Sequence, residues 1–165
     1  MAYPDRMVPG PGQESVWDYP RPARWEDSGK HIRVEFNGVV IAETDRAKRV
    51  VETSHPPSYY IPPEDLRQEY FELIARSTFC EWKGVARYYS IQVGDRRAEA
   101  AAWFYPAPTP AFAEIQNYVG IYPSHVDACY VDGEQVQAQP GDFYGGWITS
   151  DIVGPFKGSP GTWGW

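Results

Sequence analysis

The sequence predicts a mainly β, antiparallel fold that is either barrel-like or built from two sheets. Its 165 residues suit one domain with a sizeable core. Fifteen glycines and sixteen prolines favour short elements joined by tight turns, because both residue types disfavour helix interiors. Three hairpin patterns occur, and helical segments do not alternate with strands as they do around a parallel sheet.

The first hairpin pattern covers residues 32–42. Ile32–Phe36 alternates apolar and polar residues, and Val39–Ala42 is an apolar return segment. Asn37 and Gly38 lie between them, and both tolerate the positive φ angles of a two-residue hairpin turn. The segment therefore predicts two paired antiparallel strands.

Two further hairpins follow the same logic. Gly94-Asp95 and Asp132-Gly133 are the turns, because glycine and aspartate favour tight reversals. The strands expected around them cover residues 85–93 with 96–105, and residues 126–131 with 134–136.

Helical structure is expected in two short segments. Thr109 followed by proline is typical of a helix cap and first helical position. Ala111–Tyr118 would form that helix, with Phe112 and Ile115 facing inward. A second helical turn is expected to begin at Pro62–Asp65.

The composition divides the chain into three parts. Residues 1–29 form a proline-rich, extended segment whose aromatics, Trp17 and Tyr19, could dock on the body. Residues 30–140 form the β domain. Residues 141–165 form a tail rich in aromatics, glycine and proline, expected to pack on the domain or on a second subunit. Its role as a strap over the core, a homodimer arm or a pocket lid stays open.

Charge and composition exclude several partners. The formal charge is −7 and the basic residues are scattered, so a nucleic acid polymer is not an expected partner. No apolar run approaches membrane-spanning length and no signal region opens the sequence, so no membrane partner and a cytoplasmic location are expected. Two cysteines fit a reducing compartment and exclude a zinc site of four cysteines.

His55 is the first candidate for chemistry. Two prolines follow it, so its backbone is stiff and extended. Histidine titrates near neutral pH and can act as a general base or contact a ligand. The alternative is a structural hydrogen bond at the entry to a strand.

Cys80 and Lys83 form the second candidate. A thiolate is the nucleophilic form of cysteine, and a nearby cation such as Lys83 favours it, whereas Glu81 opposes it. Gly84 would let the backbone turn sharply into the next strand. The alternative for Cys80 is a buried apolar role, which is also the expectation for Cys129.

The usual catalytic signatures are absent from the sequence. The histidines lack the spacing of a zinc protease, and no CxxC pair, phosphate-binding loop or Gly-x-Ser-x-Gly turn occurs. We therefore expect neither a metal nor a cofactor.

Aromatic residues supply the remaining signal. Tyr60, Trp82 and Trp103 lie near the predicted hairpins and are candidate ligand contacts. Strand alternation places Arg87 and Tyr89 on one face with Val85, Ile91 and Val93, which we expect to face the core. An inward Arg87 beside aromatic rings would grip an anionic or planar ligand. The alternative is that Arg87 lies at the exposed end of its strand.

Several motifs together resemble a known family, the domain of unknown function family numbered 427 (DUF427). The resemblance covers Glu14 to about Gly133, and the tail resembles that of longer members. The motifs are ESVWDYP at 14–20, TSHPP at 53–57, YYIP at 59–62, CEWKG at 80–84, ARYYS at 86–90 and AAW at 101–103. Ala100 departs from the pattern, where an asparagine is expected; if that amide contacts the ligand in relatives, this protein binds something different.

The resemblance implies a fold. It indicates two antiparallel sheets in a β-tent-like arrangement with one or two short helices. Proteins of that group often pin their sheets with zinc through paired CxxC motifs, which this sequence lacks, so packing or the tail must replace the pin. A nucleotidyltransferase label attached to the family finds no support in the residues, because no acidic pair follows a phosphate-binding loop.

Three hypotheses for function follow. The first is a cytosolic module that binds a small, planar or anionic molecule in an aromatic-lined cleft. The second is an enzyme in which Cys80 or His55 acts on a small molecule while Lys83 stabilises negative charge. The third is a scaffold that oligomerises through its tail.

Overall fold

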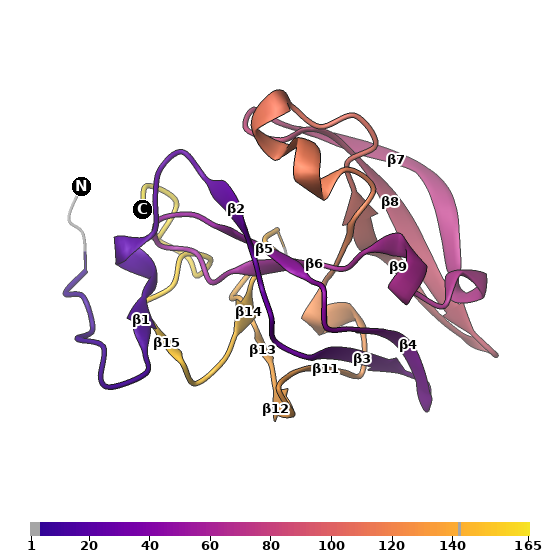
Figure 1. The fold of residues 1–165 in the computed structure, drawn as a ribbon, viewed down its shortest axis with the longest axis horizontal. Coiled ribbons are helices and arrows are strands. Elements are labelled where there is room, and N and C mark those ends of the chain that lie inside the picture. The colour runs from indigo at the N-terminus through magenta and orange to yellow at the C-terminus, as the bar shows by residue number, and fades with distance from the viewer. Residues whose placement is uncertain (1–3, 142) are drawn as a thin grey trace.

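Strands dominate the computed structural model, which describes residues 4–141 and 143–165 (Figure 1). The strands are β1 (Glu14–Ser15), β2 (Arg24–Asp27), β3 (Ile32–Phe36), β4 (Val39–Thr44), β5 (Lys48–Val51), β6 (Ser58–Tyr60), β7 (Phe71–Cys80), β8 (Gly84–Val93), β9 (Arg96–Phe104), β10 (Val119–Ile121), β11 (Ala128–Val131), β12 (Glu134–Gln135), β13 (Gln137–Ala138), β14 (Trp147–Ile148) and β15 (Ile152–Val153). The predicted mainly β fold with antiparallel sheets is confirmed, and the sheets do not close into a barrel within the described residues.

The strands form three main sheets. Their orders are β10-β9-β8-β7, β12-β11-β3-β4 and β2-β5-β6, and all of these pairings are antiparallel. Two strand pairs, β13-β14 and the parallel β1-β15, join the tail to the rest of the chain. No helix in the described residues is long and apolar enough to cross a membrane.

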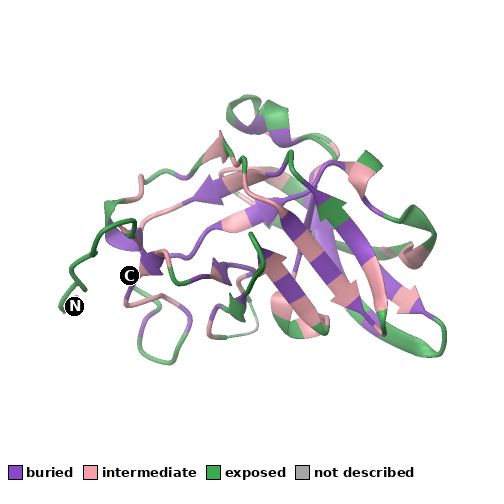
Figure 2. Cartoon of the chain, turned by 60° about the horizontal axis from the view of Figure 1, so that its bottom comes forward, coloured by how far each residue is buried: buried purple, intermediate pink, exposed green. Residues whose placement is uncertain are grey.

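The three predicted hairpins are confirmed. β3 and β4 flank Asn37 and Gly38, whose φ angles are 49° and 78°. β8 and β9 flank Gly94-Asp95, and β11 and β12 flank Asp132-Gly133. Buried positions lie along the strands, whereas the turns are exposed (Figure 2).

The helices are shorter than expected. The described residues contain five 3-10 helices instead of one or two helices: η1 (Val16–Asp18), η2 (Pro63–Asp65), η3 (Gln68–Tyr70), η4 (Pro110–Ile115) and η5 (Pro123–His125). Phe112 and Ile115 of η4 are buried as predicted. Thr109 occupies the cap position but does not cap the helix through its side chain; its hydroxyl donates to the carbonyl of Trp82 instead (2.6 Å).

The sequence patterns did not predict β7. Within this strand Ile74 pairs with Tyr88 and Ser77 pairs with Arg87, so Ala75 and Arg76 form a two-residue bulge. Most side chains of β7 are exposed, so its sequence lacks the alternation of apolar and polar residues by which a strand is recognised. β7 forms one edge of its sheet.

A second bulge lies in β9. Ser90 of β8 lies opposite the segment between Ala98 and Ala102, in which Ala100 has a φ of 47°. The Ala100 amide donates to the Ser90 hydroxyl (3.0 Å), and that hydroxyl donates to Glu99 (3.0 Å). Asparagine adopts this left-handed conformation more readily than alanine, so backbone geometry gives a physical reason for an asparagine at this position.

Two cores lie on opposite faces of β8 and β9. The main core fills the space between the two four-stranded sheets and includes Ile91 and Phe104. The second core contains Tyr88 and Trp103, which pack with side chains of β5, β6 and η4. The sheet β2-β5-β6 continues the sheet β10-β9-β8-β7, because Ile61 and Val119 exchange two backbone hydrogen bonds (2.8 and 2.9 Å).

The N-terminal segment and the tail pack together. Val16 and Trp17 form a small third cluster with Ile152, and β1 and β15 lie side by side in Figure 1. The tail residue Trp147 is completely buried, and its indole N–H donates to the carbonyl of Ile121 (3.0 Å).

Candidate functional site

A cavity of about 440 Å³ opens beside the second core. Its lining includes strand residues of β5–β9, the loop between β5 and β6, the turn between β7 and β8, and the tail. The charged, aromatic and other polar residues of the lining, with one glycine, include Glu52, His55, Arg76, Cys80, Trp82, Lys83, Tyr88, Trp103, Tyr105, Tyr122, Tyr144, Gly145 and Lys157. This volume falls within the range of small-molecule sites.

A fixed turn holds Trp82 and Lys83 at the cavity. Cys80 pairs with Gly84 across the β7–β8 hairpin, and Gly84 adopts a φ of 107°, a value that L-residues rarely adopt. Thr109 clamps the turn, because its hydroxyl donates to Trp82 and its amide donates to the carbonyl of Lys83 (3.1 Å). The sharp reversal predicted at Gly84 is therefore confirmed.

Lys83 is a partly buried cation without a carboxylate partner in the described part of the chain. Its ammonium lies 5.6 Å from the centre of the Tyr105 ring, a cation–π contact. Burial lowers the pKa of Lys83, but its electrostatic interactions with Tyr60, Cys80 and Glu52 outweigh burial and raise that pKa overall. The ammonium is therefore charged at neutral pH and borders an open space.

His55 is 9 % exposed, and one of its nitrogens is already committed. Nδ1 lies 2.8 Å from the carbonyl oxygen of Thr53, which can only accept, so Nδ1 carries the proton. The Glu52 carboxylate lies 3.9 Å from the same nitrogen, and the ring packs edge-on against Tyr144 (4.9 Å). Burial lowers the pKa of His55 more strongly than Glu52 raises it, so the neutral imidazole dominates at neutral pH.

The His55 backbone is held from two sides. Ser54 has a φ of 72°, its amide donates to Val16 (3.0 Å), and its carbonyl accepts from the amide of Lys157 (2.9 Å). The N-terminal segment and the tail thus fix the loop that carries His55.

Trp103 forms the back wall of the cavity. Its indole N–H donates to the Tyr60 hydroxyl (3.1 Å), and its ring lies 4.6 Å from that of Tyr122. Gly120 and Gly145 lie against the indole, where an added Cβ would come within 2.5 and 2.3 Å of ring atoms. Only glycine leaves room for the ring at both positions.

Two further cations lie at the rim. The bulge in β7 places the Arg76 guanidinium 4.8 Å from the Tyr88 ring centre, and Lys157 of the tail lies 5.5 Å from that of Tyr144. Sequence reasoning missed Arg76, Tyr122, Tyr144 and Lys157. No motif marks them, because a bulge and the path of the tail bring them to the cavity.

Five of the predicted site residues meet at this cavity: His55, Cys80, Trp82, Lys83 and Trp103. Tyr60 lies directly behind them, bonded to Trp103.

Arg87 and Tyr89 do not line the cavity. Ala86 and Tyr88 are the inward residues of this part of β8, so Val85 and Arg87 are exposed, which corrects the expected facing. Tyr89 stacks on Phe104 (4.8 Å) at the edge of the main core. Arg87 lies toward the exposed end of its strand, as the alternative predicted, because the main core covers this face of β8 only from Tyr89 onward.

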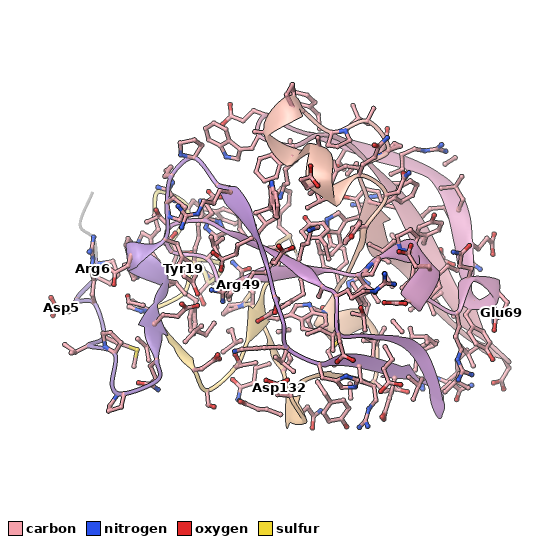
Figure 3. The ribbon with its side chains drawn as sticks, viewed as in Figure 1. Asp5, Arg6, Tyr19, Arg49, Glu69 and Asp132 are labelled. Carbon is pink, nitrogen blue, oxygen red and sulfur yellow. The ribbon has the colours of Figure 1, made fainter. Side chains whose placement is uncertain are left out.

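The second cavity, of about 300 Å³, differs in its charges. It contains Arg49, which pairs with Glu14 (2.7 Å) and Glu26. The Tyr19 hydroxyl donates to Glu14 (2.7 Å), and Figure 3 labels Tyr19 next to Arg49. Lys30 pairs with Asp151 in the same cavity. Because these cations have carboxylate partners, the 440 Å³ cavity is the better candidate for ligand binding.

Within residues 4–141 and 143–165, no three His, Cys, Asp or Glu side chains lie close enough together to hold a metal ion. Cys129 is buried in the main core, and burial raises the pKa of its thiol.

Comparison with known proteins gives one match. The model of the family described as Domain of unknown function (DUF427) matches residues 24–132. That range contains His55, Cys80, Lys83 and Trp103, whereas Tyr144 and Lys157 lie beyond it. No curated protein matches the chain.

Proposed function

This chain belongs to the DUF427 family, and we propose that it binds a small, planar, anionic molecule in the 440 Å³ cavity. The observation that carries the proposal is Lys83. A charged ammonium in a partly buried setting is costly unless an anion or several dipoles compensate it. Glu52 interacts with Lys83 electrostatically but forms no ion pair with it among the described residues, so an anionic ligand in the cavity would complete the compensation of this charge.

The cavity walls support the planar shape. Trp82, Trp103 and Tyr105 present flat apolar surfaces, on which a planar molecule can stack. Arg76 and Lys157 add positive charge at the rim. Such a rim would attract an anion to a protein whose net charge is otherwise negative. Both cysteines are free thiols, which fits our proposed cytoplasmic location.

Two variants test this proposal with 2-naphthoate as a planar anionic probe. Lys83→Met keeps most of the side-chain length and removes the charge, so the dissociation constant should rise about tenfold to a hundredfold. Arg87→Met removes an exposed cation from the outer face of the same hairpin and should leave binding unchanged. Calorimetric titration measures both, and equal binding by Lys83→Met and the unmodified protein would contradict the proposal.

A thiol reaction at Cys80 is the second candidate function. Cys80 borders the same cavity as the neutral, fixed His55, and its electrostatic interaction with Lys83 brings a cation to the thiolate. Iodoacetamide at pH 7 should therefore label Cys80 faster than it labels an unfolded thiol, and Lys83→Met should slow that labelling. Cys129 is the internal control, since it is buried and should stay unmodified. Labelling of Cys80 no faster than in urea would exclude this chemistry.

A further inference from the structure

His55 presents a single hydrogen-bonding atom to the cavity. The Thr53 carbonyl fixes the proton on Nδ1, so the neutral ring has its lone pair on Nε2. No partner for Nε2 occurs in the described part of the chain, although the residue is 91 % buried. Among the described residues Arg33 Nε is the one fully buried side-chain nitrogen or oxygen without a hydrogen-bond partner, so His55 Nε2 stays accessible and can accept from a donor in the cavity that its residue lines.

Neighbouring groups hold the ring without reaching that atom. Glu52 approaches on the Nδ1 side, and Tyr144 packs edge-on against the ring. Ser54 Oγ lies 3.5 Å from Nδ1 as well. The orientation of the imidazole is therefore set by protein contacts before any ligand arrives.

Lys83 and His55 belong to one binding space. Both border the same cavity, and Glu52 interacts electrostatically with both side chains. Lys83 favours an anionic acceptor, whereas the lone pair of His55 Nε2 favours an N–H or O–H donor. One planar ligand in the shared cavity that carries both groups would match both side chains.

We infer that the ligand is an aromatic acid that also carries a hydroxyl or N–H group, with its anionic group at Lys83 and its donor at His55 Nε2. This inference rests on the proposed function, because it specifies the molecule that the same cavity holds. It excludes ligands whose second polar group is only an acceptor, such as an ether or a second carboxylate, since an acceptor would face the lone pair of Nε2.

Hydroxylated naphthoates test the inference. The dissociation constants of the 3-, 6- and 7-hydroxy isomers of 2-naphthoate are compared with that of 2-naphthoate. The isomer that binds most tightly is then compared with its methoxy counterpart and with its neutral amide. At least one isomer should bind about three- to tenfold more tightly than 2-naphthoate, the size expected for one added hydrogen bond. Methylation of that hydroxyl should abolish the gain, and the amide should lose affinity because it has no charge for Lys83.

Three variants assign the gain to one atom. His55→Phe removes the acceptor and should abolish the gain while leaving 2-naphthoate binding. His55→Gln restores an acceptor oxygen and should recover part of it. Glu52→Gln removes the carboxylate near His55 Nδ1 and should leave the gain in affinity unchanged, because Nε2 is not affected. Thermal unfolding confirms that each variant is folded.

The outcomes separate the inference from the proposed function. If 2-naphthoate binds through Lys83 but no hydroxy isomer gains affinity, or if the gain survives His55→Phe, the inference is wrong and the proposed function stands. If neither 2-naphthoate nor any hydroxylated isomer binds, the proposed function fails and the inference fails with it.

Discussion

His55 and His31 experience opposite electrostatic environments. Around His55, burial lowers the pKa together with Lys157 and Arg21, against the opposing effects of Glu52 and the Thr53 carbonyl. His31 is half-buried and bonded to Asp45 and Glu43, both at 2.7 Å, and these hydrogen bonds raise its pKa. The two histidines therefore link protonation to folding with opposite signs.

Stability should depend on pH through both residues. Because the folded pKa of His55 lies below its unfolded value of about 6.5, protons favour the unfolded chain, and His55 destabilises the fold as the pH falls below that value. His31 has a raised pKa, so its contribution is fully present below about 6.5 and is lost as the pH rises through its folded pKa. Urea unfolding at pH 5.5 and 8.5 measures the free energy of unfolding. Between pH 8.5 and 5.5 that free energy should fall less in His55→Gln than in the unmodified protein. His31→Gln should reduce stability more at pH 5.5 than at 8.5, and the same change at both pH values would contradict this assignment.

At the scale of elements, turn chemistry was predictable and bulges were not. Asn37-Gly38 and Asp132-Gly133 adopt the positive φ angles that their residue types favour, so the hairpins were visible in the sequence. The bulges in β7 and β9 contain Ala75, Arg76 and Ala100, none of which is a typical turn former. Their positions depend on pairing with β8, which local sequence does not encode.

The β9 bulge carries a backbone cost at Ala100. Its φ of 47° is unfavourable for alanine but open to glycine. Glycine also gives the unfolded chain more conformational entropy, which offsets part of the gain, so Ala100→Gly should raise the free energy of unfolding by up to about 1 kcal/mol. Ala100→Asn should give a smaller gain. The control is Ala86→Gly in the regular part of β8, which should destabilise the protein. Chemical denaturation measures the free energy of unfolding of all three variants. A lower value for Ala100→Gly than for the unmodified protein would contradict the claim that the backbone is strained at Ala100.

At the scale of the whole molecule, the tail is part of the fold. Trp147 is buried against Tyr59 (5.2 Å), and its backbone amide donates to the carbonyl of Pro57 (2.8 Å). Phe143, Tyr144 and Gly145 line the cavity. The same segment therefore closes the main core and forms one wall of the candidate site.

Two tryptophans of the tail allow a matched test of this role. Trp147→Ala removes a fully buried indole and should lower the free energy of unfolding by about 3–5 kcal/mol. Trp163→Ala changes a side chain that is 65 % exposed and should shift that free energy by no more than about 0.5 kcal/mol. Urea titration compares them; similar values for the two variants would mean that the tail is not required for folding of the domain.

The sequence by itself determined the class of fold, the three hairpins, the family and five of the residues around the cavity. These features depend on local chemistry, namely alternation along strands, glycine and asparagine at positive φ, and motifs within a few residues. Tertiary structure alone decided that Arg87 and Tyr89 lie away from the cavity and that Arg76, Tyr144 and Lys157 border it. The physical reason is that the main core covers only one end of this face of β8, that the pairing of β7 with β8 is not encoded locally, and that the tail crosses the fold to pack against strands distant from it in sequence.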